Sequence, residues 1–174
     1  MKNRICNFVI WCLALLPLGA GAQAIKNGAK ETLELANKVQ QQILQCSQKA
    51  DLIDQQIIDR EIIFLRFNNE NMNRLLQSKA ILNDGQVKVL NTFRSAVNRC
   101  RSLSSQFPLL SMVEIYQKYY QQVDQIYDDL LEKKITIGEA NQKKMKLLEE
   151  AFIKWHAIED STRKSNATQW PFSL

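Results

Sequence analysis

Apolar residues recur at alternating spacings of three and four in the first third of the chain, at Ala36, Val39, Ile43, Cys46, Ala50, Ile53 and Ile57. This spacing is typical of a helix that packs one seam against partner helices. The next residues are apolar on more than one stripe, with Ile58, Ile62, Ile63, Phe64 and Leu65. Because one neighbouring helix cannot cover so wide a face, either several helices surround this stretch or it is exposed for a partner.

The helical spacing resumes after polar breaks at residues 68–71 and 83–85 and after Phe107 and Pro108. The later stripes are Met72, Leu75, Leu76 and Ala80; Val89, Leu90, Phe93, Val97, Cys100 and Leu103; Met112, Tyr116, Tyr119, Val123, Ile126 and Leu130; and Met145, Leu148, Phe152, Trp155 and Ile158. Thr136 and Glu139 have the spacing of a capping box, which predicts a helix start. No stretch alternates as a strand does. We expect an all-α fold, an up-and-down bundle of four main long helices with short connections.

The first residues have the pattern of a secretory signal peptide. Lys2 and Arg4 precede an apolar run at residues 8–18 and then small residues at 19–24. The run is shorter than the roughly 20 residues that cross a membrane. We expect cleavage after Ala22, or after Ala24, and a periplasmic or secreted protein. The organisation is then a signal peptide at 1–22, one helical bundle domain at 23–165 and a C-terminal tail at 166–174.

The charge of the chain is mild. The net charge of +5 includes Lys2 and Arg4, so the mature chain carries 21 basic and 18 acidic residues. This balance does not favour nucleic acid as a partner. At most it predicts a weak attraction to an anionic envelope surface.

Two cysteines remain after cleavage, Cys46 and Cys100, because Cys6 and Cys12 leave with the signal peptide. In an oxidising compartment we expect these two to form one intrachain disulfide. An intermolecular bridge and two free thiols are the alternatives.

Such a disulfide bears on where the first helix turns back. If that helix ran unbroken to Asn83, Cys46 would lie about 37 residues before the turn and Cys100 about 16 after it, a mismatch of about 30 Å. A turn near Asn71 makes the two arms nearly equal. We therefore expect the turn near Asn71 and a kink or short loop at residues 83–85, with a helix that runs on to Asn83 as the alternative.

Residues 126–149 carry one local resemblance. Leu130-Leu131, Ile135-Thr136, Glu139, Lys144 and Leu147-Leu148 resemble the short helical hairpin called SHOCT, although that family carries Gly where this chain has Lys134. The resemblance implies a helix-turn-helix that tends to self-associate.

Catalytic and metal-binding patterns are sparse. The one histidine, His156, follows a core position and is expected at the surface, and one histidine with paired cysteines cannot form a zinc site. Acidic residues cluster at Asp124, Asp128, Asp129 and Glu132. Since Asp129 precedes Lys133 by four, ion pairs on the helix surface are the first expectation and acid-base catalysis a distant one. We expect no enzyme, no cofactor and no metal.

Binding of another macromolecule is therefore the expected function. Four tyrosines on one helix cannot all face one seam, and glutamines such as Gln55 and Gln56 give a weakly charged flank. The candidate interface residues are Ile58, Ile62, Ile63, Leu65, Tyr120, Tyr127, Trp170 and Phe172. We expect an adaptor or accessory part of a bacterial envelope assembly, with possible self-association. The alternative is a periplasmic inhibitor or immunity protein that blocks a toxin or hydrolase.

Overall fold

The computed structural model describes residues 19–49, 52–66 and 68–164, and this part of the chain contains helices and no strand. The helices are α1 (Gly19–Lys49), α2 (Leu52–Ile57), the π-helical turn η1 (Ile58–Ile62), α3 (Met72–Gln77), α4 (Asp84–Asn98), the 3-10 helix η2 (Arg101–Gln106), α5 (Leu110–Leu131) and α6 (Ile137–Lys164). None of the described helices is long and apolar enough to cross a membrane.

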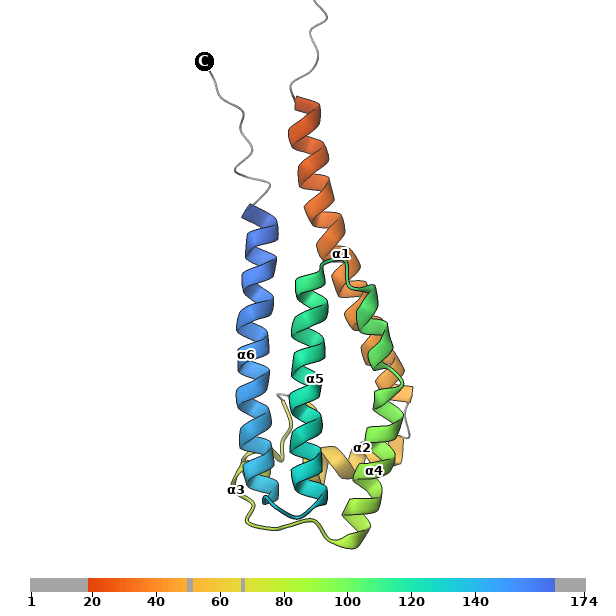
Figure 1. Cartoon of the computed structure of the whole chain (residues 1–174), viewed down its shortest axis with the longest axis vertical. Coiled ribbons are helices and arrows are strands. Elements are labelled where there is room, and N and C mark those ends of the chain that lie inside the picture. Colours follow the sequence, from red (N-terminus) through yellow and green to blue (C-terminus); the bar gives the residue numbers. More distant parts are fainter. Residues whose placement is uncertain (1–18, 50–51, 67, 165–174) are drawn as a thin grey trace, which may run out of the picture.

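The four long helices α1, α4, α5 and α6 run alternately down and up (Figure 1). Helices α5 and α6 lie side by side as an antiparallel hairpin, and α1 and α4 form the other side of the bundle. The α6 start has the predicted capping box: the Thr136 amide donates to the Glu139 carboxylate over 2.7 Å, and the Glu139 amide donates to Thr136 Oγ1 over 3.2 Å. The expected all-α, up-and-down bundle is confirmed.

The connection between α1 and α4 is not short, which corrects the expectation. The crossing segment, residues 52–66 and 68–83, spans the lower end of the bundle through α2, η1 and α3 before α4 begins. Asn83 is not part of a kink but the N-cap of α4, because its Oδ1 accepts from the Gln86 amide over 2.9 Å and the Asn83 amide donates to Gln86 over 3.1 Å. The turn expected near Asn71 is instead the entry to the short helix α3.

The predicted disulfide is confirmed. Cys46 and Cys100 are joined with their Cα atoms 5.7 Å apart. The bond ties the last turns of α1 to the junction of α4 and η2. Helix α1 ends at Lys49, soon after its cysteine, and the crossing segment occupies the lower part of the bundle. The disulfide is therefore incompatible with a helix unbroken to Asn83, as expected, although the chain returns by a long crossing and not by one tight turn.

The wide apolar stretch after α2 lies in the core. Ile58, Ile62 and Ile63 have no exposed surface, and they pack in one cluster with residues of α4, α5 and α6. The expectation that these three isoleucines form an exposed interface is therefore wrong, because several helices surround them. A second cluster higher in the bundle joins α1 to the start of α5 through Ala36, Val39, Ile43, Phe107 and Met112.

Buried polar side chains of α6 hold the crossing segment in place. Asn141, fully buried, accepts from the Phe64 amide over 2.9 Å and donates to the Ile62 carbonyl over 2.8 Å. Lys144, also buried, donates to the Phe64 carbonyl over 2.5 Å. At the first turn of α6, the Gly138 amide donates to a carbonyl of the crossing segment. These bonds satisfy backbone groups that the irregular segment leaves unpaired.

Candidate functional site

A groove with a volume of about 870 Å³ lies between α5 and the crossing segment. Its other walls come from the end of α1, from α4 and from η2, and Lys144 of α6 reaches it. Ser47 and Arg101, which directly follow the two disulfide cysteines, both line it. The disulfide therefore fixes the spacing between two walls of the groove.

Tyrosines of α5 form one wall. Tyr119, Tyr120 and Tyr127 line the groove, and Tyr127 shares a helix face with the other two because it follows them by eight and seven positions, about two turns. The Tyr116 hydroxyl donates to the Tyr120 hydroxyl over 3.2 Å, and the rings of Tyr119 and Tyr120 meet edge to face at 5.2 Å. Burial raises the pKa of Tyr119 and of Tyr127 well above the usual value. These phenols remain neutral hydrogen-bond donors at physiological pH.

Two arginines connect this wall to the acidic residues of α5. The Arg101 guanidinium lies 4.5 Å from the centre of the Tyr120 ring and donates from Nη2 to Asp124 Oδ1 over 2.9 Å. Arg94 contacts Asp124 at 3.3 Å and Asp128 at 2.5 Å. The hydrogen bond from Arg94 to Asp128 raises the pKa of Arg94. Asp124 and Asp128 are thus bound to guanidinium groups.

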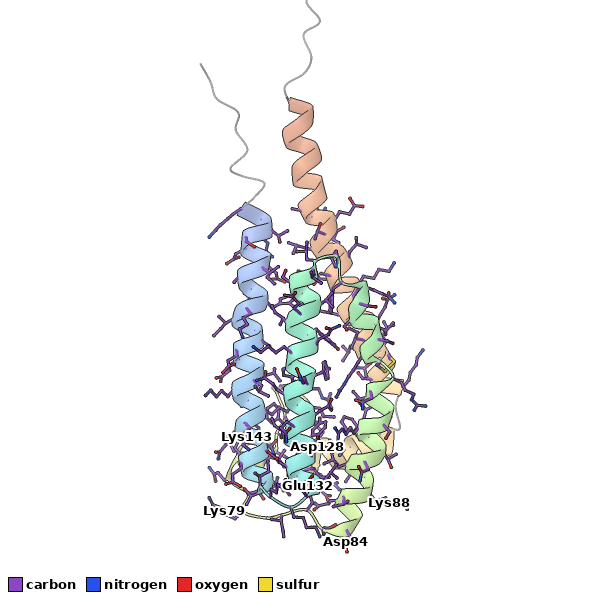
Figure 2. The ribbon with its side chains drawn as sticks, in the orientation of Figure 1. Lys79, Asp84, Lys88, Asp128, Glu132 and Lys143 are labelled. Atoms are coloured by element: carbon purple, nitrogen blue, oxygen red, sulfur yellow. A yellow bond between two sulfur atoms is a disulfide. The ribbon has the colours of Figure 1, made fainter. Side chains whose placement is uncertain are left out.

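The remaining acidic residues of α5 lie at the lower end of the bundle. Figure 2 shows Asp128 of α5, Glu132 just after it, Lys143 of α6 and Asp84 of α4 in the lower part of the bundle. Asp129 contacts Lys143 of α6 at 3.4 Å, and Lys133 contacts Asp84 of α4 at 3.0 Å. The expected pair of Asp129 with Lys133 is therefore replaced by two pairs between helices. Lys133 takes a partner on α4 because the α5 helix ends at Leu131, before Lys133.

The crossing segment supplies the polar side of the groove. Gln48 at the end of α1 and Gln56 and Asn71 of the crossing segment are among its lining residues, as is Asn69, whose amide is bonded to Asp59 and to the Asn71 backbone. Asp59 is engaged locally: its Oδ1 accepts from the Leu65 amide over 2.5 Å and from Asn69 Nδ2 over 2.8 Å. Amide and phenol groups on opposite walls can bond both donors and acceptors of a polypeptide.

Lys144 is the buried cation of the groove. Its side chain is 5 % exposed, and Nζ lies 4.9 Å from the centre of the Phe64 ring as well as against the Phe64 carbonyl. Burial lowers the pKa of Lys144 to about 8, against a smaller raising effect of Asp59. At neutral pH the amine is still mostly protonated.

The structure separates the expected interface residues into three groups. Leu65, Tyr120 and Tyr127 line the groove, whereas the three isoleucines of η1 and its end are core. Trp170 and Phe172 lie outside the described residues. Sequence reasoning missed Arg101 and Lys144. The available signal for Lys144 was its place in the α6 stripe beside Met145 and Leu148, where a charged residue is unexpected.

The side chains considered for metal binding and for acid-base catalysis are not arranged as a site within the described residues. Within the described ranges no group of three His, Cys, Asp or Glu side chains could hold a metal ion. His156 has a side chain that is 49 % exposed, and its Nδ1 contacts Glu159 of the next turn at 3.0 Å. A histidine held in this way is a surface residue, as expected.

Comparison with protein-family models, with curated proteins and with solved structures finds no match to this chain. The interpretation of the groove therefore rests on its own residues.

Proposed function

We propose that this protein is an exported, non-enzymatic helical protein that binds a segment of a partner protein in the groove beside α5. In this proposal it serves as an adaptor or accessory part of a bacterial envelope assembly. The observation that carries the proposal is the composition of the groove walls, with tyrosines opposite amide side chains.

Such walls suit a polypeptide ligand. Tyrosine gives large contact area at a small cost in side-chain entropy, and Asn and Gln adapt their hydrogen bonds to the ligand backbone. The volume of about 870 Å³ falls within the range of ligand-binding clefts. The disulfide, by fixing two walls, reduces the ordering that binding requires.

The acidic residues of α5 support a binding role over a catalytic one. A general acid or base must be able to exchange a proton with a substrate. Both carboxylate oxygens of Asp124 are contacted by guanidinium groups, and Asp128 Oδ1 is contacted by Arg94, so these oxygens are already engaged within the protein.

The N-terminal pattern and the disulfide support export. Residues 1–18 lie outside the described residues, so the signal peptide rests on its sequence pattern. A disulfide between Cys46 and Cys100 is stable in an oxidising compartment and rare in a reducing one. The SHOCT-like hairpin adds self-association as a further proposal, which size-exclusion chromatography of the mature protein tests.

Affinity capture from the envelope fraction under non-reducing conditions tests the proposed function. The bait proteins are the wild type, a groove-filling variant Gln56→Trp at an exposed lining position, and a control Ile153→Ser. Ile153 is 68 % exposed on α6 and does not line the groove. We expect one partner to be captured by the wild type and the control and to be lost with Gln56→Trp.

Equal capture by all three baits would contradict the proposed site. A captured toxin or hydrolase whose activity falls on binding would instead support the inhibitor alternative.

A further inference from the structure

The groove holds buried hydrogen-bond donors that the described chain leaves without an anionic partner. Lys144 and Tyr127 both line it, and each side chain is 5 % exposed. A buried ammonium such as that of Lys144 costs free energy unless a counter-charge or hydrogen-bond acceptors satisfy it. The counter-charge and the hydrogen-bond acceptors that these two residues lack within the described chain indicate the groups that a ligand must supply.

Lys144 lacks a counter-charge. Its ammonium donates to one neutral acceptor, the Phe64 carbonyl, and lies near the Phe64 ring. No ion pair joins Lys144 to a carboxylate of the described residues, and the charge of Asp59 raises its pKa by less than burial lowers it. An ammonium has three donors, so its remaining hydrogen-bonding capacity and its charge are both unmet.

Tyr127 and Arg101 add two more hydrogen-bond donors that have no acceptor among the described residues. No hydrogen bond joins the Tyr127 hydroxyl to another described residue, and its oxygen keeps some accessible surface. Burial of the residue raises the pKa of this phenol, so it is a neutral donor. Arg101 Nε is buried and lacks an acceptor among the described residues, although its two Nη atoms bind Asp124. Three donors from α5, η2 and α6 thus line one groove.

The two carboxylates that line the groove do not neutralise Lys144. Asp59 already accepts from Leu65 and Asn69, and its second oxygen lies 3.5 Å from Arg66. Glu70 is exposed at the rim. The charged lining residues are four basic and two acidic. Arg60, Arg66 and Arg101 each pair with a carboxylate, whereas Lys144 makes no ion pair with a described residue, so a ligand with a negative charge at Lys144 complements the groove.

We propose that the groove takes an acidic segment of the partner protein and places one of its Asp or Glu carboxylates against Lys144 and Tyr127. The inference rests on the proposed function, because it names the chemistry of the segment that the groove binds. A carboxylate there would complete the hydrogen bonds of two buried groups, and charge-assisted bonds of this kind are roughly twice as strong as neutral ones. The flanking backbone of the segment would lie along Gln48, Gln56 and Asn71.

A random library of 12-residue peptides displayed on phage tests the inference. The library is selected on the full mature protein with its disulfide intact, and selected peptides are then measured against variants. Lys144→Met removes the charge and keeps the length of the side chain. The matched control, Lys146→Met, removes one charge from the same helix at a position that does not line the groove.

We expect the selected peptides to be enriched in Asp and Glu. We also expect them to bind Lys144→Met about tenfold to a hundredfold more weakly and Lys146→Met nearly as well as the wild type. Replacing the acidic residues of a selected peptide by Asn or Gln should cause a similar loss. Circular dichroism and gel filtration verify that both variants are folded.

Four results would overturn the inference. Peptides that bind the groove without acidic enrichment, or that bind Lys144→Met as tightly as the wild type, would refute the acidic segment while the proposed function stands. Peptides that bind Gln56→Trp as tightly as the wild type would refute both the acidic segment and the proposed function. Binding to phosphatidylglycerol vesicles that depends on Lys144, with no peptide selected, would show that an anionic lipid and not a protein segment is the ligand.

Discussion

At the scale of single residues, α6 places two polar side chains where its apolar stripe continues. Asn141 accepts from the Phe64 amide and donates to the Ile62 carbonyl. Lys144 donates to the Phe64 carbonyl, and its charge has no ion-pair partner among the described residues. Asn141 is a structural residue, because its amide nitrogen already donates to two carbonyls of the protein, those of Ile62 and Ile137. Lys144 has capacity left for a ligand, which is why we assign it to the groove.

Lys144 should make stability rise at alkaline pH. Burial lowers its pKa from 10.5 to about 8 in the folded protein, so the unfolded chain binds more protons between these two values. The free energy of unfolding should therefore rise through this window. From pH 7 to pH 10 we expect the wild type to gain roughly 2 to 3 kcal/mol relative to Lys144→Met, measured by urea denaturation. A constant difference between the two proteins would show that the amine is not desolvated in the folded state.

Asn141→Ala should be strongly destabilising. It leaves the buried Phe64 amide and Ile62 carbonyl without partners, at about 2 to 4 kcal/mol together. The adjacent exposed Gln142 makes one bond, to the Leu76 carbonyl, so Gln142→Ala should cost about 1 kcal/mol or less. Chemical denaturation compares them, and equal losses would refute the role of Asn141.

At the scale of elements, the start of α6 is packed against the crossing segment at van der Waals limits. The amides of Ile137 and Gly138 donate to the carbonyls of Ala80 and Ser78 over 2.8 and 2.9 Å. This approach is possible because residue 138 has no Cβ. A Cβ there would lie 2.5 Å from the Ser78 oxygen.

Gly138→Ala should therefore lower stability, although Gly to Ala inside a helix normally raises it by about 1 kcal/mol. The first turn of α6 would have to move away from the crossing segment. A Cβ added at Gly28 of α1 would meet nothing within 4 Å, so Gly28→Ala is the control and should be neutral or stabilising. Thermal unfolding of both variants decides the matter: a higher melting temperature for Gly138→Ala would contradict the close approach.

Much of the fold could be predicted from particular residues. The Thr136–Glu139 capping box and the Cys46–Cys100 pair depend on local spacing or on a covalent bond, and the structure has both. Most of the helical stripes fall on helices, but Ala80 is exposed after α3 ends at Gln77, and Phe152 of α6 is 58 % exposed. The crossing segment could not, because its irregular backbone is held by Asn141 and Lys144, which are distant in sequence. Of the residues that line the groove, the sequence predicted only Leu65, Tyr120 and Tyr127 as interface residues, because the other walls depend on the crossing segment.

At the scale of the whole molecule, the disulfide holds two walls of the groove and closes a long loop. It joins residues separated by 54 positions, and Cys100 is buried. The crossing segment lies entirely within this loop. Stability and the shape of the groove should therefore depend on the same bond.

The double variant Cys46→Ser and Cys100→Ser should lose about 4 kcal/mol of unfolding free energy, from the loop-closure entropy returned to the unfolded chain. Urea denaturation of the oxidised wild type, the reduced wild type and the variant measures this loss. We expect the reduced wild type and the variant to agree. A variant as stable as the oxidised protein would show that the bond does not constrain the unfolded chain.

The most direct test of the groove as the binding site is photo-crosslinking in cells that make the protein. A photoreactive amino acid replaces Gln56 at the groove in one full-length protein and exposed Ile153 on α6 in another. We expect a discrete crosslinked adduct with one partner protein from position 56 and none from position 153. An adduct from position 153 alone, or none from position 56, would contradict the central claim that a partner segment binds in this groove.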